Sequence, residues 1–514
     1  MPSLKLGRLL LFAFILAALL LGALSKTSFA QRGELELTVI DSETGEPVAA
    51  TVTIKTSKDR PYFPKNATKA GPAFCIGGMT MLNVSRGSYA FEITRGLEYR
   101  SVVGRFDIER GATDSKAVTL KRIRNLTTEG WYSGDLMLIA DPENAPLIMN
   151  AADLQFANII SWSNSTNHWQ DHLLPETPIV KLESGRIYDA LGGIDWRKSG
   201  GLVFSNWPAA IQLQNNEESY QSPLDTMRFV KSNKDTFVAA IDASSWDLPL
   251  WLAGEQLDAV GVAAAALTAD GVIQPLGSRP EVKGSADQLA ATFWSERIYF
   301  HLLNAGFRIP PTAGSCSGQI ENIPGYNRVF VHCGEEFSQA SWLENHRLGR
   351  VVISNGPLLR VTANGGYLPG YVFRAANGGT VKVDLAADLA LSEKATYLEI
   401  IHNGVAEHQI RLEEWAKKGG QLPTLEFRES GWFLVRVVTN NSKTVHFAST
   451  GPYYVEIGEK KRISKQSAQF FMDWVLERAR ALKSEKSQAA QAAFEQYRDA
   501  REFWNRILES ANVD

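Results

Sequence analysis

Two aspartates, Asp135 and Asp242, are placed where an acid–base pair could work. Asp135 lies within Gly130–Ile139, and Asp242 closes the apolar run Phe237–Ile241, which suits a buried strand. A carboxylate at the end of such a run must either meet a partner or face a cavity. If both faced one cavity about 5–10 Å apart, they could act as general acid and base in glycoside-type hydrolysis. Structural use of each carboxylate is the competing interpretation.

A pair of histidines offers a second kind of chemistry. His168 and His172 have i,i+4 spacing, which on a helix would turn both imidazoles to one face and suit a divalent metal. However, the segment begins at Asn164 in a run rich in Asn, Ser and Thr, and no HExxH pattern surrounds it. We therefore interpret it as a polar pocket or surface loop rather than as a metal site.

The cysteines do not form a disulfide framework, because the chain has three of them in 514 residues. Cys316 and Cys333 could pair, but isolated, buried thiols are the preferred interpretation. Ser315 adjoins Cys316 without a Gly-x-Ser-x-Gly elbow, so the sequence does not identify either side chain as a nucleophile.

The elements that must position these residues change along the chain. Short alternating strands between turn clusters over 33–122 predict a β-sandwich. Over 125–360, apolar runs alternate with helical stretches, which predicts an α/β region of largely parallel strands. Strand patterns return over 361–460 and predict a second β domain, and helical periodicity over 464–510 predicts a terminal helical hairpin.

Within 125–360 the alternation fits a closed barrel and an open wound sheet equally well. The Asn403-Gly404 dipeptide farther along is a strong hairpin signal. The runs predicted as strands of the α/β region are 156–162, 201–204, 236–241, 257–262 and 328–331, and the predicted helices are 145–154, 223–232 and 296–305.

The N-terminus predicts export. Lys5 and Arg8 precede the apolar run Leu9–Leu24, and Ser28-Phe29-Ala30 fits a small-x-small cleavage site. This pattern is typical of a secretory signal peptide over 1–30, with retention as an N-terminal anchor as the alternative. We expect a secreted, periplasmic or cell-envelope protein without a further membrane span. The net charge of −3 argues against nucleic acid as a partner.

The segment Gly-Trp-Tyr-Ser-Gly-Asp-Leu-Met-Leu-Ile at 130–139 resembles the first motif of the polymerase-and-histidinol-phosphatase (PHP) superfamily. The resemblance is to the exported CehA/McbA-like metallohydrolases, in which Asp-Leu-His-x-His delivers two imidazoles to one ion from one strand face. Met137 and Ile139 take those two positions here. A thioether and a sec-butyl group cannot hold a hard or borderline divalent metal.

Other metal motifs of this family are replaced as well. The stretch 192–201 resembles a Gly-Glu-Asp-Glu-Arg-like motif, with Ile194 at the expected glutamate. Ala-Gly-Ser-Cys-Ser-Gly at 313–318 resembles Ala-Gly-Ser-Asp-x-His, with Cys316 at the aspartate. No histidine follows the strand that ends before Asp242. We therefore expect no bound metal of the family type and no other cofactor.

The resemblance covers roughly 33–458. It implies a distorted (β/α)7 barrel with its site at the C-terminal ends of the strands. The patterns described above add the two β domains and the helical hairpin on either side of it. In the first β segment, Thr-Gly-Glu-Pro-Val-Ala-Ala at 44–50 and Gly-Ser-Tyr-Ala-Phe at 87–91 resemble the carboxypeptidase-regulatory-like fold. That likeness implies a spacer or adhesion module without chemistry.

These observations predict an exported pseudoenzyme of PHP type that binds a ligand or partner, such as a glycan or a cell-envelope component, without turnover. The alternatives are a phosphoesterase- or glycosidase-like hydrolase that uses Asp135 and Asp242 without a metal, and a structural assembly subunit. The residues at or beyond predicted strand ends that could line a ligand pocket are Asn167, His168, Asp195, Trp246, Asp247, Arg308, Ser315, Asn327 and Arg328.

Overall fold

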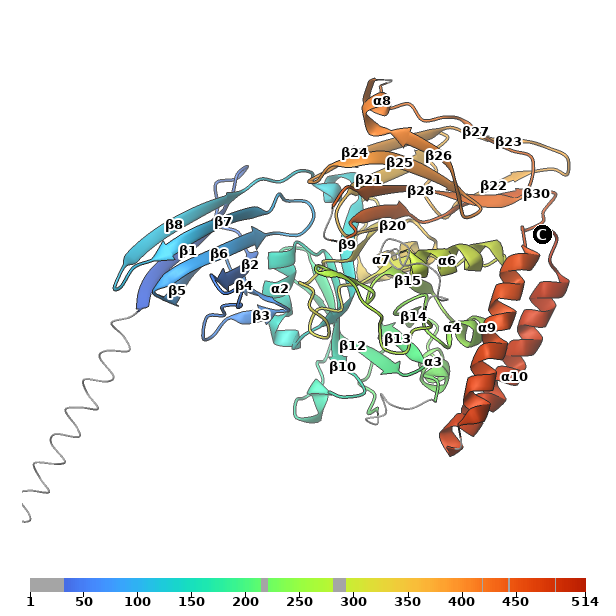
Figure 1. Ribbon diagram of the computed structural model, residues 1–514, viewed down its shortest axis with the longest axis horizontal. Helices are drawn as coiled ribbons and strands as arrows, with labels where there is room; N and C mark the ends of the chain where they lie inside the picture. Colours follow the sequence, from blue (N-terminus) through green and yellow to red (C-terminus); the bar gives the residue numbers. More distant parts are fainter. Residues whose placement is uncertain (1–31, 214–220, 281–292, 418, 442–443, 486) are drawn as a thin grey trace, which may run out of the picture.

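The computed structural model describes residues 32–213, 221–280, 293–417, 419–441, 444–485 and 487–514 (Figure 1). The described chain is a mixed α/β structure with several sheets and a pair of C-terminal helices. The predicted signal peptide over 1–30 lies outside the described residues. No helix in the described ranges combines the length and apolarity that a membrane span requires.

Two small sheets form the N-terminal part, at one end of the molecule (Figure 1). Their strands alternate between buried and exposed side chains, as in the burial of Leu35, Leu37 and Val39 along the first strand, and the buried side chains of both sheets share one hydrophobic cluster. The three-stranded sheet has the order β5-β1-β8 and the five-stranded sheet the order β3-β4-β2-β6-β7. The strands are β1 (Arg32–Asp41), β2 (Ala50–Thr56), β3 (Thr68–Ala70), β4 (Ala73–Ile76), β5 (Met79–Ser85), β6 (Gly87–Thr94), β7 (Val102–Ile108) and β8 (Thr113–Leu120).

A large mixed sheet occupies the centre of the molecule, and its strands are almost completely buried. It runs in the order β18-β15-β14-β13-β12-β10-β9-β19-β20 and continues into β29-β28-β25-β26. Its first part comprises β9 (Trp131–Ile139), β10 (Phe156–Trp162), β12 (Ile187–Arg197), β13 (Gly200–Ser205), β14 (Phe237–Ala240), β15 (Ala259–Ala263), β18 (Pro311–Ala313), β19 (Arg328–His332) and β20 (Val351–Ser354). The short β11 (Ile179–Lys181) pairs with β12, and β16 (Leu267–Thr268) pairs with β17 (Gly271–Val272).

The prediction of largely parallel strands is only partly right. The pairs β9·β10, β10·β12, β14·β15 and β15·β18 are parallel, but β13 is antiparallel to both neighbours. Only Lys198 and Ser199 connect β12 to β13, and a link this short permits a hairpin but no crossover. Strand β19 also pairs antiparallel with β9.

Short helices connect the central strands. Three of them fall where the sequence predicted helices, with end points that differ by up to two residues: α2 (Ala145–Ala152), α3 (Leu224–Val230) and α6 (Trp294–Asn304). The helices α4 (Leu248–Ala253) and α7 (Gln339–Arg347) and the 3-10 turns η1 (Leu126–Glu129), η2 (Pro142–Asn144) and η3 (His168–Gln170) were not predicted.

The C-terminal strands extend the same hydrogen-bonded path rather than starting a separate one, because β20 pairs with β29. The predicted hairpin is confirmed: β25 and β26 are joined by Asn403 and Gly404, with φ of 50° and 91°. The remaining elements are β21 (Leu358–Ala363), β22 (Val372–Ala375), β23 (Val381–Val383), β24 (Leu385–Ala390), β25 (Ala395–His402), β26 (Val405–Arg411), α8 (Leu412–Lys417), β27 (Leu425–Phe427), β28 (Gly431–Thr439), β29 (Phe447–Thr450) and β30 (Tyr453–Ile457).

The predicted terminal helical pair is confirmed as α9 (Lys465–Ser484) and α10 (Gln488–Glu509), which lie side by side (Figure 1). Their aromatic faces are docked on the protein, since Trp474 and Trp504 are fully buried. Trp504 Nε1 donates a hydrogen bond to the carbonyl of Pro249 in α4, 2.9 Å away. This contact ties α10 to α4.

Candidate functional site

A cavity of about 250 Å³ opens at the C-terminal ends of β9, β10 and β12, and we call it the strand-end cavity. Its apolar wall includes Ile139, Ile160, Ile194, Trp196 and Ile320. The polar residues of its lining are Ser163, Asn164, Ser165, Thr166, Gln274 and Gln319. No Asp, Glu, Lys, Arg or His lines the cavity among the described residues. Its surface is therefore neutral, with hydroxyl and amide groups beside an aliphatic wall.

Of the four positions at which the PHP resemblance expects metal ligands, two line this cavity and two lie two residues before lining residues in the chain. Ile139 and Ile194 line it directly. Met137 and Cys316 lie side by side and fully buried, with Met137 Sδ 3.6 Å from Cys316 Sγ. Because Met137 and Ile139 are i and i+2 on β9, they point to the same face of the sheet. Aliphatic and sulfur side chains thus occupy all four positions.

Asp135 is a fully buried carboxylate that joins three segments. Its Oδ1 accepts hydrogen bonds from the backbone N–H groups of Met137 and Ser315, both at 3.0 Å. Its Oδ2 accepts from the Ser315 hydroxyl and from the Gly325 N–H, the latter at 2.9 Å. Burial raises the pKa of Asp135, and the four hydrogen bonds oppose that shift. Asp135 is not among the residues that line the strand-end cavity.

Asp242 is also a buried carboxylate held by several hydrogen bonds. Its Oδ1 accepts hydrogen bonds from the Ser244 N–H at 2.8 Å, the Ser244 hydroxyl at 2.6 Å and the Ser295 hydroxyl of α6 at 2.7 Å. Burial raises the pKa of Asp242, and burial together with the charges of Asp135 and Asp242 raises that of the Cys316 thiol. Both carboxylates therefore lie near the Cys316 thiol, and neither lines the strand-end cavity.

Asn164 of the cavity lining is held by Asp195, which does not line the cavity. Asp195 receives Arg197 through two hydrogen bonds of 2.6 Å and accepts a third, of 2.8 Å, from Thr226. Asn164 donates to Asp195 at 2.8 Å and accepts from the Trp196 N–H at 2.6 Å. This network holds Trp196 in the cavity wall.

Three other predicted residues are buried in the same region. The Ser315 hydroxyl donates to the Asp135 carboxylate, and Asn327 donates to the backbone carbonyls of Ala264 and Leu267 at 3.1 and 3.0 Å. Arg328 donates to the Gly325 carbonyl at 2.7 Å, and burial lowers its pKa to about 10. These side chains position loops.

The remaining predicted residues lie elsewhere. Asp247 accepts hydrogen bonds from Arg478 of α9 at 3.1 Å and from Tyr497 of α10 at 2.7 Å, so it anchors the terminal helices. Trp246 lies under the Arg478 guanidinium, 5.7 Å from the ring centroid. Arg308 pairs with Glu456 in β30. None of these residues lines the strand-end cavity.

The loop after β10 carries Asn167 and the two histidines. Asn167 caps η3 by accepting a 3.0 Å hydrogen bond from Trp169 N–H and donates to Gln212 at 3.1 Å. His168 and His172 are not on an α-helix, yet their rings stack with centroids 4.0 Å apart. Sequence reasoning missed Glu143, whose Oε1 lies 3.3 Å from His168 Nε2.

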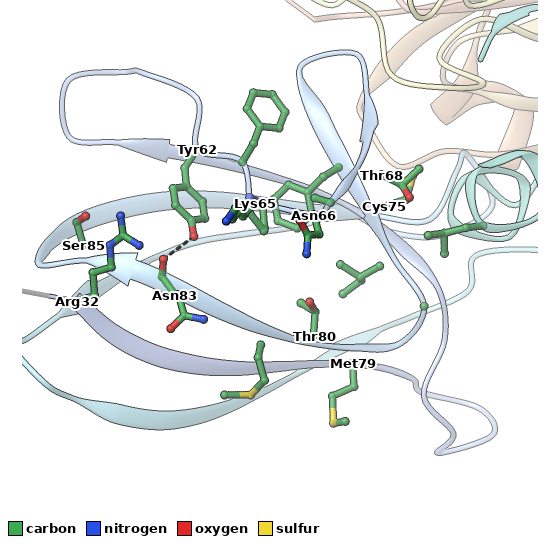
Figure 2. Close-up of a pocket in the computed structure, with 18 residues that line it drawn as sticks. Arg32, Tyr62, Lys65, Asn66, Thr68, Cys75, Met79, Thr80, Asn83 and Ser85 are labelled. Atoms are coloured by element: carbon green, nitrogen blue, oxygen red, sulfur yellow. Dashed lines mark hydrogen bonds between the residues drawn. The ribbon is translucent and has the colours of Figure 1, made fainter. Parts of the chain in front are cut away.

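A second and larger cavity, of about 570 Å³, opens in the N-terminal part beside β5 (Figure 2). Tyr62 closes one side by donating a 2.8 Å hydrogen bond to the carbonyl of Asn83. The described lining includes the cations Arg32 and Lys65 and no acidic side chain. It differs in this respect from the neutral strand-end cavity.

The expectation of isolated thiols is confirmed. Cys75, Cys316 and Cys333 are all free, with the first two buried. Burial raises the pKa of Cys75 and of Cys333 to about 12. None of these thiols has the lowered pKa that an activated nucleophile needs.

Comparisons with known proteins do not assign this chain to a family. No protein-family model matches it, and no curated protein sequence matches it. Among solved structures, the Bacillus anthracis TIE protein aligns at 18% identity over 21% of this chain, with a TM-score of 0.15. The alignment spans only 19% of that protein. A likeness at this level supports no conclusion about fold or activity.

Proposed function

We propose that this chain is an exported, non-catalytic binding protein of PHP type that holds a neutral glycan in the strand-end cavity. On this proposal the central sheet is a degenerate form of the distorted (β/α)7 barrel, and residues 1–30 direct export to the cell envelope or beyond. The cavity lies where that fold places its site, at the C-terminal ends of strands.

The observation that carries the proposal is a neutral cavity lined by two of the four replaced metal positions, while the other two are buried against each other. Met137 contacts Cys316, while Ile139 and Ile194 form part of the wall. A phosphoester substrate would need cations or a metal to stabilise its charge. Among the described residues, the cavity is lined by no cationic side chain and by no carboxylate, histidine or cysteine that could hold a metal.

The lining suits a sugar ring better than a charged metabolite. The apolar face of a sugar can rest on Ile194 and Trp196, and its hydroxyls can meet the polar groups of Thr166, Gln274 and Gln319. The metal-independent hydrolase has less support, because Asp135 and Asp242 are engaged in buried hydrogen bonds and do not line the cavity.

The test compares glycan binding by the wild type and by two tryptophan variants. Gln319→Trp places an indole at the cavity mouth, and Gln491→Trp places one at an exposed glutamine of α10 as a matched control. We expect neutral oligosaccharides found on a glycan array to bind in calorimetry, with affinity reduced about tenfold or more in Gln319→Trp and unchanged in the control.

Two results would overturn the proposal. One is equal binding of every array hit by Gln319→Trp and by the wild type. The other is turnover of a chromogenic phosphoester that Gln319→Trp abolishes and the control retains, because that would restore an enzyme at this cavity.

A further inference from the structure

Three donor groups outside the strand-end cavity converge at the surface. Glu143, His168 and His172 each present one carboxylate oxygen or imidazole nitrogen, and these atoms lie within 4.8 Å of one another. Glu143 Oε1 and His168 Nε2 are 3.3 Å apart. Two ligands of a tetrahedral zinc ion, at bond lengths of about 2.0–2.1 Å, are separated by roughly 3.3–3.4 Å. The separation of this pair already matches that of two ligands sharing an ion.

The tautomer of His172 leaves its Nε2 free to bind a metal. Its Nδ1 lies 2.8 Å from the backbone carbonyl oxygen of His168. A carbonyl oxygen only accepts hydrogen bonds, so Nδ1 must carry the proton and Nε2 of the neutral ring holds the free lone pair. A backbone carbonyl on the far nitrogen is the arrangement that commonly orients a metal-bound histidine.

His168 lies between two carboxylates. Asp141 Oδ1 is 3.6 Å from Nδ1, which is beyond hydrogen-bond distance, and Glu143 is next to Nε2. His168 Nε2 is buried and makes no hydrogen bond within the described part of the chain, although Glu143 is close to it. An ion between Nε2 and Glu143 would satisfy this orphaned atom.

The position of the three residues gives the ion a mechanical role. Glu143 lies in η2, four residues beyond Ile139 in the cavity wall, and His168 begins η3, two residues beyond Thr166 at the cavity rim. A shared ion would join the loop after β9 to the loop after β10. Glu143 and His172 are exposed, which leaves room for water as a fourth ligand.

We propose that Glu143, His168 and His172 form a binding site for one borderline divalent transition metal, best matched by Zn²⁺, which clips together the two loops beside the strand-end cavity. Two imidazoles and one carboxylate favour Zn²⁺ over Mg²⁺ and Ca²⁺, which prefer sets of oxygen ligands. The site does not depend on what the cavity binds.

The experiment is a calorimetric zinc titration of the full chain after removal of any affinity tag and of bound metal with a chelator. We expect one equivalent of Zn²⁺ to bind to the wild type and no saturable binding of Mg²⁺. His172→Ala is the principal variant, because this exposed side chain can be removed without opening the core. We expect it to weaken zinc binding by about tenfold or more, and Glu143→Gln to do the same.

The matched control is His402→Ala. His402 Nδ1 lies 2.7 Å from Glu407 Oε2, so this variant removes another histidine paired with a glutamate, far along the chain in β25. It should keep the wild-type zinc affinity. The zinc-dependent rise in Tm should likewise persist in His402→Ala and disappear in His172→Ala.

The absence of one-equivalent zinc binding to the wild type would overturn the site. Zinc affinity in His172→Ala and Glu143→Gln equal to that of the wild type would overturn it as well, and so would a loss in His402→Ala as large as that in His172→Ala.

Discussion

The buried floor under the strand-end cavity and the loops beside that cavity use similar residues to opposite effect. The floor consists of Asp135, Met137, Asp242 and Cys316, and its carboxylates are enclosed by hydroxyl and backbone donors. In the loop cluster of Glu143, His168 and His172, donor atoms meet near solvent without a comparable set of partners. The availability of an ionisable side chain for chemistry therefore depends on whether the surrounding chain already occupies it.

The largest expected effect comes from removing the carboxylate at the centre of the floor. Asp135→Ala leaves the backbone N–H groups of Ser315 and Gly325 buried without an acceptor, so we expect a loss of about 3–5 kcal/mol in the free energy of unfolding. Chemical denaturation measures it. A neutral or stabilising effect would show that Asp135 is held ready for a ligand rather than used by the fold.

The next effect tests whether the replaced metal positions are now core. Met137→Ala should cost about 2–5 kcal/mol, because it opens a cavity against Cys316 in a fully buried site. Met81→Ala in β5 is the control, since Met81 is 46% exposed and its loss should change stability by only about 0.5 kcal/mol or less. Equal losses in the two variants would contradict the packing role of Met137.

A smaller effect follows from the raised pKa of Asp135. The folded protein holds a proton there more readily than the unfolded chain, so the contribution of this group is fully present below its ordinary pKa of 3.8 and is lost as the pH rises through the folded pKa. The stability of the wild type relative to Asp135→Asn should therefore increase as the pH is lowered from 7 towards 4. Paired urea denaturations across this range would refute the sign if the difference decreased.

The smallest effect belongs to the loop cluster in the absence of metal. His172→Ala and Glu143→Gln alter exposed side chains, so we expect each to change the free energy of unfolding by about 0.5 kcal/mol or less in metal-free buffer. With zinc at about 100 times its Kd, the wild type should gain roughly 2.7 kcal/mol, and the variants should gain less. A large loss in the free energy of unfolding without metal would show that these side chains, like those of the buried floor, are needed for the fold itself.

Local patterns in the sequence were sufficient for many elements. Strand β10 (Phe156–Trp162) has the predicted bounds, the two terminal helices fall within the predicted 464–510, and Asn403-Gly404 forms the predicted hairpin. Each depends on local periodicity or turn chemistry. The antiparallel orientation of β13 was not predicted, because its hairpin partner β12 was not among the predicted strands. Helix α7 was missed because its apolar residues are few.

The candidate site was harder to predict from the sequence than the fold. The convergence of Met137 on Cys316 was implied by a family resemblance, but whether Asp135 faces a cavity depends on donors that lie 180 and 190 residues away along the chain. The proximity of Glu143 to His168 could have been predicted from the order of the strands. Both residues follow the C-terminal ends of β9 and β10, which are parallel neighbours, so the loops after them must meet.

Anomalous diffraction at the zinc edge from zinc-soaked crystals tests the central claim most directly, because one map covers both regions. The account predicts a peak between Glu143, His168 and His172, and no peak between Met137, Ile139, Ile194 and Cys316. A zinc peak on the buried floor would show that the strand ends still hold metal and would contradict the account.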